Sequence, residues 1–143
     1  LMCDLRVAAR SAVFGVYCRR WGVPLIDGGT VRLPRIVGME RALDLILTGR
    51  AVGADEALAM GLVNRVVDDG QALSQALALA QQIAGFPQQC LRADRASAFA
   101  QASLPLAQAL QCEGAGGYAV VLAEGVPGAA RFAAGAGRHG DGA

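Results

Sequence analysis

The stretch from Phe14 to Leu33, FGVYCRRWGVPLIDGGTVRL, limits what this chain can fold into more than any other part of the sequence. A short apolar segment leads into a polar and aromatic patch, and a turn-rich run then opens a helix at Thr30. Asp27 precedes Gly28-Gly29 and is a natural N-cap for that helix. Two glycines at a helix start let a ligand approach the backbone closely and expose amide donors where the helix dipole is positive. A plain turn is the alternative.

The composition is typical of a globular protein with a large apolar content. Hydrophobic residues make up 54% of the 143 residues and charged residues 17%, which excludes a disordered chain. This length allows one domain at most. All 13 basic residues are arginine and the net charge is +1. Because no basic run is dense, nothing indicates a partner that is a nucleic acid.

The four cysteines are far apart in the sequence and form no CxxC pair: Cys3, Cys18, Cys90 and Cys112. The single histidine, His139, lies in a glycine-rich tail. Zinc sites need several such ligands at close spacing, so we predict no metal site. We expect reduced thiols and a cytoplasmic protein. No apolar run is long enough to span a membrane, and no signal segment precedes the first predicted strand.

The apolar pattern predicts strands first and helices afterwards. Leu5–Ala8, Ala12–Phe14 and Leu62–Val67 have the alternation or the short apolar run of strands. Pro34 is expected to end or kink the helix that opens at Thr30. Further helices are predicted over Met39–Leu47, Ala54–Met60, Ala72–Ile83, Pro87 to about Ala100, Leu106–Leu122 and Val126–Phe132.

The predicted helix Met39–Leu47 has one apolar face, on which Ala42, Leu43, Ile46 and Leu47 are expected to be core residues. Gly49 and Gly61 are expected to end their helices as left-handed cap residues. In the helix Ala72–Ile83, a similar stripe is formed by Leu73, Ala76, Leu77, Ala80 and Ile83.

Five motifs occur in a fixed order: CDLRVAA from Cys3, FG at Phe14, DGGTVRLPRIVG from Asp27, LTGR from Leu47 and AxxxGLVNRVV from Ala57. In this order they resemble the crotonase superfamily, the enoyl-CoA hydratases and isomerases. The resemblance runs from Cys3 to about Ile83 and more loosely to the C-terminus, and it covers only the C-terminal half of such a protein. It implies a partial α/β fold of the ClpP/crotonase type, a ββα spiral with few short strands followed mostly by helices.

The resemblance divides the chain into three regions. Residues 1–70 correspond to the C-terminal part of the ββα core, residues 71–134 to a helical oligomerisation region, and residues 135–143 to a flexible tail. We expect a homo-oligomer, a trimer or a dimer of trimers, once the fold is complete. The chain is expected to be either a fragment of a longer product or one half that a separate N-terminal half completes.

The resemblance implies a protein that processes an acyl-CoA thioester through an enolate stabilised by two backbone amides, the oxyanion hole. Coenzyme A is then part of the substrate, and no other cofactor is expected. The oxyanion donors and one catalytic glutamate lie upstream of the matching segment. The second glutamate follows an FGxP segment in hydratases, and Cys18 stands at that position here. The alternative is a binder of acyl-CoA, or an oligomer partner, that has lost hydratase chemistry.

The candidate catalytic residues are therefore Cys18 and Asp27. Cys18 is either a small buried hydrophobe or a thiol made reactive by the neighbouring Arg19 and Arg20. Asp27 is either the helix N-cap or an acid–base residue. The candidate substrate-binding residues are Trp21 at the acyl pocket, Arg19 and Arg20 at the CoA phosphates, Gly28 and Gly29 at the helix start, and Phe132 near the adenine of a neighbouring subunit's CoA. Core packing for Trp21 and plain solvation for the arginines are the alternatives.

Overall fold

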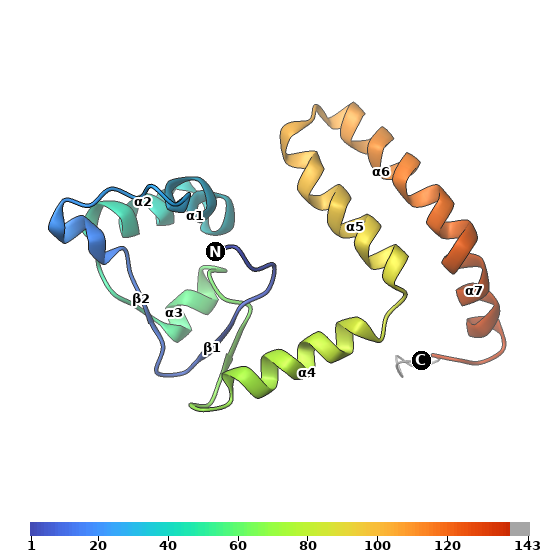
Figure 1. The fold of residues 1–143 in the computed structure, drawn as a ribbon, viewed down its shortest axis with the longest axis horizontal. Helices are drawn as coiled ribbons and strands as arrows, with labels where there is room; N and C mark the ends of the chain where they lie inside the picture. The colour runs from blue at the N-terminus through green and yellow to red at the C-terminus, as the bar shows by residue number, and fades with distance from the viewer. Residues whose placement is uncertain (138–143) are drawn as a thin grey trace. The chain divides into compact units, whose positions relative to one another are not determined.

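The computed structural model describes residues 1–137. The chain divides into two compact units, the first covering residues 1–81 and the second beginning at residue 82. Figure 1 shows the elements in order, with the strands and the first helices in blue and green. The helix α4, Ala72–Ala84, carries the chain from the first unit into the second. His139 lies outside the described residues, as does most of the predicted tail.

The four short strands of the first unit form two separate two-stranded sheets. The strands β1, Val7–Ala9, and β4, Arg65–Val67, are parallel, with Val7 opposite Arg65. The strands β2, Val13–Phe14, and β3, Val52–Gly53, are antiparallel, with Phe14 opposite Val52. All three predicted strands are therefore present, and each begins later than the sequence pattern indicates.

The strand β4 begins late because Leu62 and Val63 belong to the turn that ends the preceding helix. Their amides donate hydrogen bonds to the carbonyl oxygen of Ala57, at 2.8 and 3.2 Å. That helix, α3, spans Ala54–Ala59. Gly61 follows with φ of 78°, the left-handed conformation expected of it. The strand-like alternation of the sequence thus includes Leu62 and Val63, whose backbone amides bond to α3 and not to a neighbouring strand.

Asn64 binds Arg6 at the start of the parallel pair β1 and β4. Its Oδ1 accepts a hydrogen bond from the amide of Arg6 at 2.8 Å, and its own amide donates to the carbonyl oxygen of Arg6 at 2.8 Å. The Arg6 side chain adds a third bond, from Nε to the carbonyl oxygen of Leu62 at 2.6 Å. One residue therefore fixes the register of β1 against β4.

We expect Asn64→Leu to lower the free energy of unfolding by about 1 kcal/mol, the typical net value of one hydrogen bond. The loss arises because leucine has no acceptor for the Arg6 amide. Asn64→Asp keeps an acceptor oxygen of the same shape and should retain most of the stability. Urea unfolding of the two variants measures the difference. Equal unfolding midpoints for leucine and aspartate would show that the side-chain clamp contributes nothing.

The opposite end of the same strand pair is also held by hydrogen bonds. The Arg10 amide donates to the carbonyl oxygen of Val67 at 2.8 Å. The Ser11 amide donates to Oδ1 of Asp69 at 3.0 Å. That backbone bond, together with a side-chain bond from Ser11, lowers the pKa of the Asp69 carboxyl below its ordinary value. The two short strands are thus pinned at both ends by the turns that flank them.

The helix α1, Gly29–Val37, starts one residue earlier than predicted, and the prediction that Asp27 is its N-cap is wrong. Gly28 is the N-cap, with φ of 83°, and no side chain caps the helix. A left-handed residue at this position is readily supplied by glycine, which has no Cβ to clash. The carbonyl oxygen of Asp27, not its carboxylate, is the group in use, because it accepts a hydrogen bond from Arg32 Nη1 at 2.8 Å.

Pro34 does not end α1, which was one of the two outcomes predicted for it. The helix continues to Val37, and Gly38 caps its C-terminus. A proline in a helix removes one backbone donor, which costs stability but leaves the later turns able to form. Here both Leu33 and Val37, on either side of the proline, are buried in the core. Their burial offsets the lost hydrogen bond.

The helix α2, Met39–Thr48, confirms the predicted helix and its cap at Gly49, whose φ is 60°. Its core face is narrower than expected. Ala42, Leu45 and Ile46 are buried, whereas Leu43 and Leu47 lie at the surface, Leu47 with 66% of its area exposed. The prediction that Leu43 and Leu47 are core residues is therefore wrong for this chain. The apolar arc of α2 extends beyond what the rest of the first unit covers.

The core lies entirely in the first unit. It is formed by α1, α2, β3, α3 and the turn before β4, with a contribution from β1; its buried members are Ala8, Leu33, Val37, Ala42, Leu45, Ile46, Val52, Ala57, Met60, Leu62 and Val63. Ala12, Phe14 and Val16 pack against it from the first part of the chain. The core therefore reaches the end of β2, where the candidate site begins.

The second unit is helical. It contains α5, Gln88–Ala100, the short η2, Gln101–Ser103, α6, Leu106–Val120, the π-helix η3, Val121–Gly125, and α7, Val126–Ala133. Figure 1 shows α5 and α6 side by side as a hairpin. The predicted helices are confirmed, with Pro87 as the N-cap of α5 and not its first residue.

The glycines of α6 do not interrupt the helix, and the departure from α-helical geometry comes later, at Val121. Glu124, within the π-helix, accepts hydrogen bonds from the amides of Gln89 and Cys90 at 3.2 and 2.9 Å. These amides are among the unpaired donors at the start of α5. None of the helices α4 to α7 has a buried residue among those that the structure describes. Within residues 1–137, no helix has both the length and the apolar character needed to cross a membrane.

Candidate functional site

The candidate site is built on the short 3-10 helix η1, Tyr17–Trp21, which follows β2 after two residues. The strand β2 pairs with β3, so the start of the segment is fixed by the sheet. Cys18 lies in the first turn of η1 and is half-buried. All four cysteines of the chain are free thiols, and the other three are exposed. Cys18 is thus the one cysteine that the fold partly covers.

Both arginines of η1 bind the end of α2. Arg19 Nε donates a hydrogen bond to the carbonyl oxygen of Ile46 at 3.1 Å, and Arg20 Nη2 donates to that of Gly49 at 2.9 Å. The last carbonyls of a helix lack intrahelical partners and carry the negative end of the dipole, so a guanidinium suits them well. Arg20 also lies over the Tyr17 ring, 5.1 Å from its centroid. Neither arginine is simply solvated.

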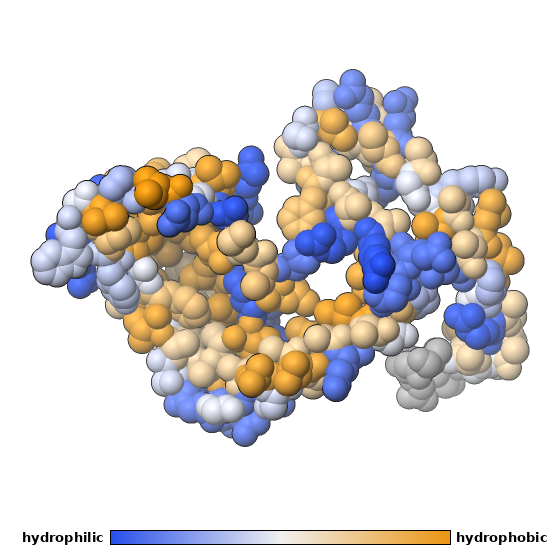
Figure 2. All heavy atoms as spheres, viewed as in Figure 1, coloured by the Kyte–Doolittle hydropathy of each residue, from blue (hydrophilic) through white to orange (hydrophobic). Residues whose placement is uncertain are grey.

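Trp21 ends η1 and points away from the core of its unit. It is 82% exposed, which excludes core packing within this chain as the reason for its presence. Gly22 follows in the left-handed conformation, and the loop that leads to α1 exposes two more apolar side chains, Val23 and Ile26. In Figure 2, apolar side chains are visible at the surface of the first unit. An exposed tryptophan next to exposed aliphatic residues is typical of a binding surface.

The glycine pair lies at the start of α1, as predicted. A Cβ at Gly28 would collide with the guanidinium of Arg32, and one at Gly29 would press on Leu25. The space beside Gly28 is therefore filled by a side chain of the same helix. Arg32 lies half-buried there with its Nη1 on the carbonyl oxygen of Asp27. A ligand at this helix start would meet a guanidinium as well as backbone amides, and both favour an anion.

Phe132 belongs to the second unit, whereas η1 belongs to the first. It lies on α7 and is 61% exposed. Of two pockets in the second unit, one lies between α5 and α6 and the other is lined by α5, α6, η3 and α7, and Phe132 lines neither. Within residues 1–137, no three histidine, cysteine, aspartate or glutamate residues come together as metal ligands would.

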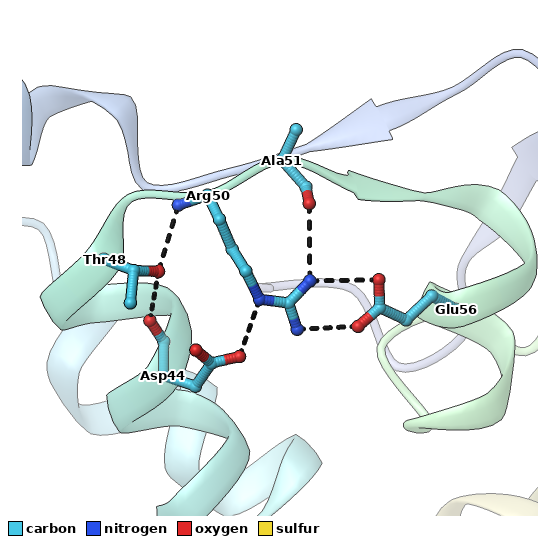
Figure 3. A network of polar contacts seen from close by, with 5 residues as sticks. All are labelled: Asp44, Thr48, Arg50, Ala51 and Glu56. Atoms are coloured by element: carbon cyan, nitrogen blue, oxygen red, sulfur yellow. Dashed lines mark hydrogen bonds and ion pairs between the residues drawn. The ribbon is translucent and has the colours of Figure 1, made fainter.

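The sequence did not indicate a compact ionic network next to η1, drawn in Figure 3. Arg50 Nε binds Asp44 Oδ2 at 2.7 Å, and its two terminal nitrogens bind the carboxylate oxygens of Glu56 at 3.0 and 2.6 Å. The Arg50 amide donates to Thr48 Oγ1 at 3.2 Å, and that hydroxyl donates to the carbonyl oxygen of Asp44 at 2.6 Å. This network ties α2, the turn after it and α3 together.

The network shifts the pKa values of its members. Hydrogen bonds from Arg50 hold the pKa of the Glu56 carboxyl below its ordinary value, chiefly through the bidentate contact. The hydrogen bonds to Glu56 and then to Asp44 raise the pKa of Arg50. Both shifts favour the charged forms. The sequence carries only an indirect signal for two members of the network. Arg50 is the last residue of the LTGR motif, and Glu56 lies in the first turn of the predicted helix Ala54–Met60.

We expect Glu56 to make the first unit sensitive to acid. A carboxyl with a lowered pKa in the folded state contributes stability that is present above its unfolded pKa and is lost as the pH falls through the folded value. The Glu56→Gln variant should be less stable than the parent near neutral pH, and the difference should shrink below about pH 4. Chemical unfolding at a series of pH values measures this. A difference that stays constant from pH 7 to pH 3 would contradict the assignment.

Comparison with protein families decides the identity of the chain. The model of the enoyl-CoA hydratase/isomerase family matches residues 1–135. The chain belongs to this family. The resemblance inferred from the five motifs is thereby confirmed, and the match extends further than the sequence motifs did, through α7.

Sequence relatives and solved structures agree with the family. A probable enoyl-CoA hydratase of Rhizobium meliloti is 40% identical over 113 residues, which cover 79% of this chain and 44% of that protein. The human enoyl-CoA hydratase domain-containing protein 2, mitochondrial, is 54% identical over 50 residues, 35% of this chain and 17% of that protein.

The fold class is confirmed by crystal structures. An enoyl-CoA hydratase subunit I from Geobacillus kaustophilus superposes with a TM-score of 0.85 at 34% identity, over 91% of this chain and 51% of that one. The enoyl-CoA hydratase of Bacillus anthracis gives a TM-score of 0.76 at 35% identity, over 80% of this chain and 44% of that one. The chain thus corresponds to about half the length of these structures and has the partial α/β crotonase fold.

Proposed function

We propose that this chain is the part of an acyl-CoA-processing protein that carries the η1 segment, and that the complete protein acts on a CoA thioester through an enolate held in an oxyanion hole. Membership of the enoyl-CoA hydratase/isomerase family supports the substrate class. The observation that supports the proposal is the position of Cys18 on η1, which follows β2 and the FG motif after two residues. By the family resemblance, we propose that Cys18 stands where a hydratase of this family has its second glutamate.

The proposed chemistry follows from what a thiol can do at this place. A thiol can transfer a proton, but its sulfur is a weak hydrogen-bond acceptor, whereas a carboxylate has two strong acceptor oxygens. A thiol therefore orients water poorly. The site is therefore better suited to proton transfer at one carbon, as in isomerisation, than to the addition of water across a double bond. Which acyl group is bound depends on pocket residues that belong to the other half of the fold.

The exposed side of η1 is proposed as the ligand side. Trp21 offers a large apolar surface, and the start of α1 supplies the amides of Gly29 and Thr30 and the guanidinium of Arg32. The CoA moiety combines an aromatic base with phosphates, so it matches an indole next to an anion-binding helix start. Arg19 and Arg20 use one nitrogen each for α2, and their remaining donors are available to phosphate oxygens.

Coenzyme A binding tests the proposal. Trp21 is the single tryptophan of the chain, so its fluorescence reports on this site alone. Titration of coenzyme A should quench it, and Arg32→Ala should weaken binding through the loss of one charge at the helix start. Arg41→Ala is the matched control, because Arg41 is an exposed arginine on α2. A bound CoA that lies wholly against other surfaces in a crystal of the complex would refute the proposal.

The second candidate is a binder of acyl-CoA, or an oligomer partner, without hydratase chemistry. Cys18 in place of a carboxylate favours it. The two candidates differ in turnover and not in binding, because both retain the exposed Trp21 and the anion-binding start of α1. A preparation that binds acyl-CoA but leaves an enoyl thioester, or its isomer, unchanged over hours would decide for the binder.

A further inference from the structure

The η1 segment has little support from the core of its own unit. None of its five residues is buried, and Trp21 at its end is almost fully exposed. Its position is fixed by the pairing of β2 with β3 before it and by two arginine contacts with the end of α2. The turn Thr48–Arg50 joins α2 to β3, so it connects the helix that binds the two arginines to the strand that pairs with β2.

The turn lies close to the residue before η1. Gly49 is left-handed, and a Cβ built on it would lie 3.2 Å from the carbonyl oxygen of Val16, immediately before η1. The carbonyl oxygen of the same Gly49 accepts the hydrogen bond from Arg20 at 2.9 Å. Any movement of this turn therefore moves both the carbonyl that holds Arg20 and the backbone against which η1 rests.

Arg50 fixes the turn. Its guanidinium makes charge-assisted hydrogen bonds to Asp44 on α2 and to Glu56 on α3, and its Nη1 also donates to the carbonyl oxygen of Ala51 at 3.4 Å (Figure 3). A bidentate arginine–carboxylate pair has a defined geometry as well as a favourable energy. Because the contacts come from both sides of the turn, they set its conformation, which a single ion pair would not do.

We propose that Arg50 is a positioning residue for the proposed CoA site, acting through the Thr48–Arg50 turn on Arg20 and on the backbone before Cys18. This inference rests on the proposed function for the identity of the ligand only. The purely structural alternative is that Arg50 adds stability to the first unit and leaves η1 where it is. The pairing of Arg50 with Glu56 adds stability in either case, so the two alternatives differ in what happens to η1 at equal distance from unfolding.

Trp21 allows the two alternatives to be separated in the protein without ligand. The steady-state anisotropy of its fluorescence reports how firmly η1 is held. Arg50→Ala should lower this anisotropy at a temperature well below unfolding, and Arg50→Lys should restore part of it, since lysine keeps one charge contact but not the bidentate geometry. The control is Val63→Ala, a core variant away from the turn, compared with Arg50→Ala at the same distance below its own unfolding midpoint.

A double-mutant cycle shows whether the effect passes through the arginine contacts. In an Arg19→Ala/Arg20→Ala background η1 is already detached from α2, so adding Arg50→Ala should change the anisotropy little further. Independent sites would give additive changes. If Arg50→Ala and Val63→Ala show the same anisotropy, or if the changes are additive, the positioning role is overturned.

Coenzyme A binding is a second measurement, and it distinguishes a failure of the proposed function from a failure of the positioning role. Arg50→Ala should weaken the Kd of the chain for coenzyme A by about 3- to 10-fold, although Arg50 itself touches no ligand in this proposal. If the parent chain binds no coenzyme A in a preparation that contains both halves of the fold, the proposed function fails, and the anisotropy comparison still decides the role of Arg50. If the parent binds and Arg50→Ala binds equally well, the positioning role is overturned and the proposed function stands.

Discussion

Cys18→Glu should raise the rate of hydration of an enoyl-CoA thioester, such as crotonyl-CoA, by about 10²- to 10⁴-fold, the usual contribution of one positioned acid–base group. The native protein should be slower than a two-glutamate hydratase by the same factor. The reason is the difference between the side chains at the end of β2. A glutamate there can hold and deprotonate water through its two carboxylate oxygens, whereas the sulfur of a thiol accepts hydrogen bonds weakly.

The assay needs a preparation that contains both halves of the fold, because this chain covers only 44% of the Rhizobium meliloti relative. Loss of the enoyl thioester absorbance follows the reaction. Cys18→Ala and Cys18→Ser are the matched controls, and both should remain close to the native rate if the thiol contributes little. Native turnover equal to that of a standard hydratase would contradict the prediction. So would a well-folded Cys18→Glu variant with no gain.

Local conformation was predictable from sequence where one residue type dominates the backbone preference. Gly49 and Gly61 were expected to end their helices in the left-handed conformation, and both do. The same argument, applied to the start of α1, gave the wrong residue. Asp27 and Gly28 are both residue types that favour the N-cap position. In the structure Gly28 is the N-cap, and Arg32 binds the carbonyl oxygen of Asp27. A contact between residues five apart in a coil–helix junction leaves no periodic signal in the sequence.

The apolar pattern predicted the helices correctly but not what covers them. Leu43 and Leu45 are equally apolar, and the predicted core face of α2 included Leu43 but not Leu45. In the structure Leu45 is 2% exposed and Leu43 is at the surface. Periodicity measures how wide an apolar arc is, and a neighbour decides how much of it is buried. That neighbour is not predictable from the helix itself.

The residues of the candidate site were predicted in sequence order, and their partners were not. Cys18, Arg19 and Arg20 are adjacent in the chain, so a motif identifies them together. Their contacts come from Ile46 and Gly49, about thirty residues later. The Arg50 network likewise joins residues on two helices and the turn between them. Such contacts depend on the packing of α2 beside η1, which the resemblance implied only as part of a fold.

Residues 1–143 expressed alone should associate in solution and unfold over a broad range. The first unit has a core of small size and two sheets of two strands each, and such ribbons are barely stable by themselves in water. The helices of the second unit have no buried residue among those described. On α2, Met39, Leu43 and Leu47 follow one another at every fourth position and are all exposed, which makes a continuous apolar stripe.

The stripe on α2 provides the decisive variants. Leu43→Gln/Leu47→Gln should shift the chain towards monomer in light scattering and lower the unfolding midpoint far less than a core variant does, because both side chains lie at the surface of the single chain. Leu45→Ala, on the buried side of the same helix, should cost about 2–5 kcal/mol and lower the unfolding midpoint strongly. The contrast depends only on which side of α2 faces the core. A parent chain that is a stable monomer with a sharp transition would contradict the expectation of association. A Leu43→Gln/Leu47→Gln variant that associates as strongly as the parent would show that the stripe is not the surface through which copies meet.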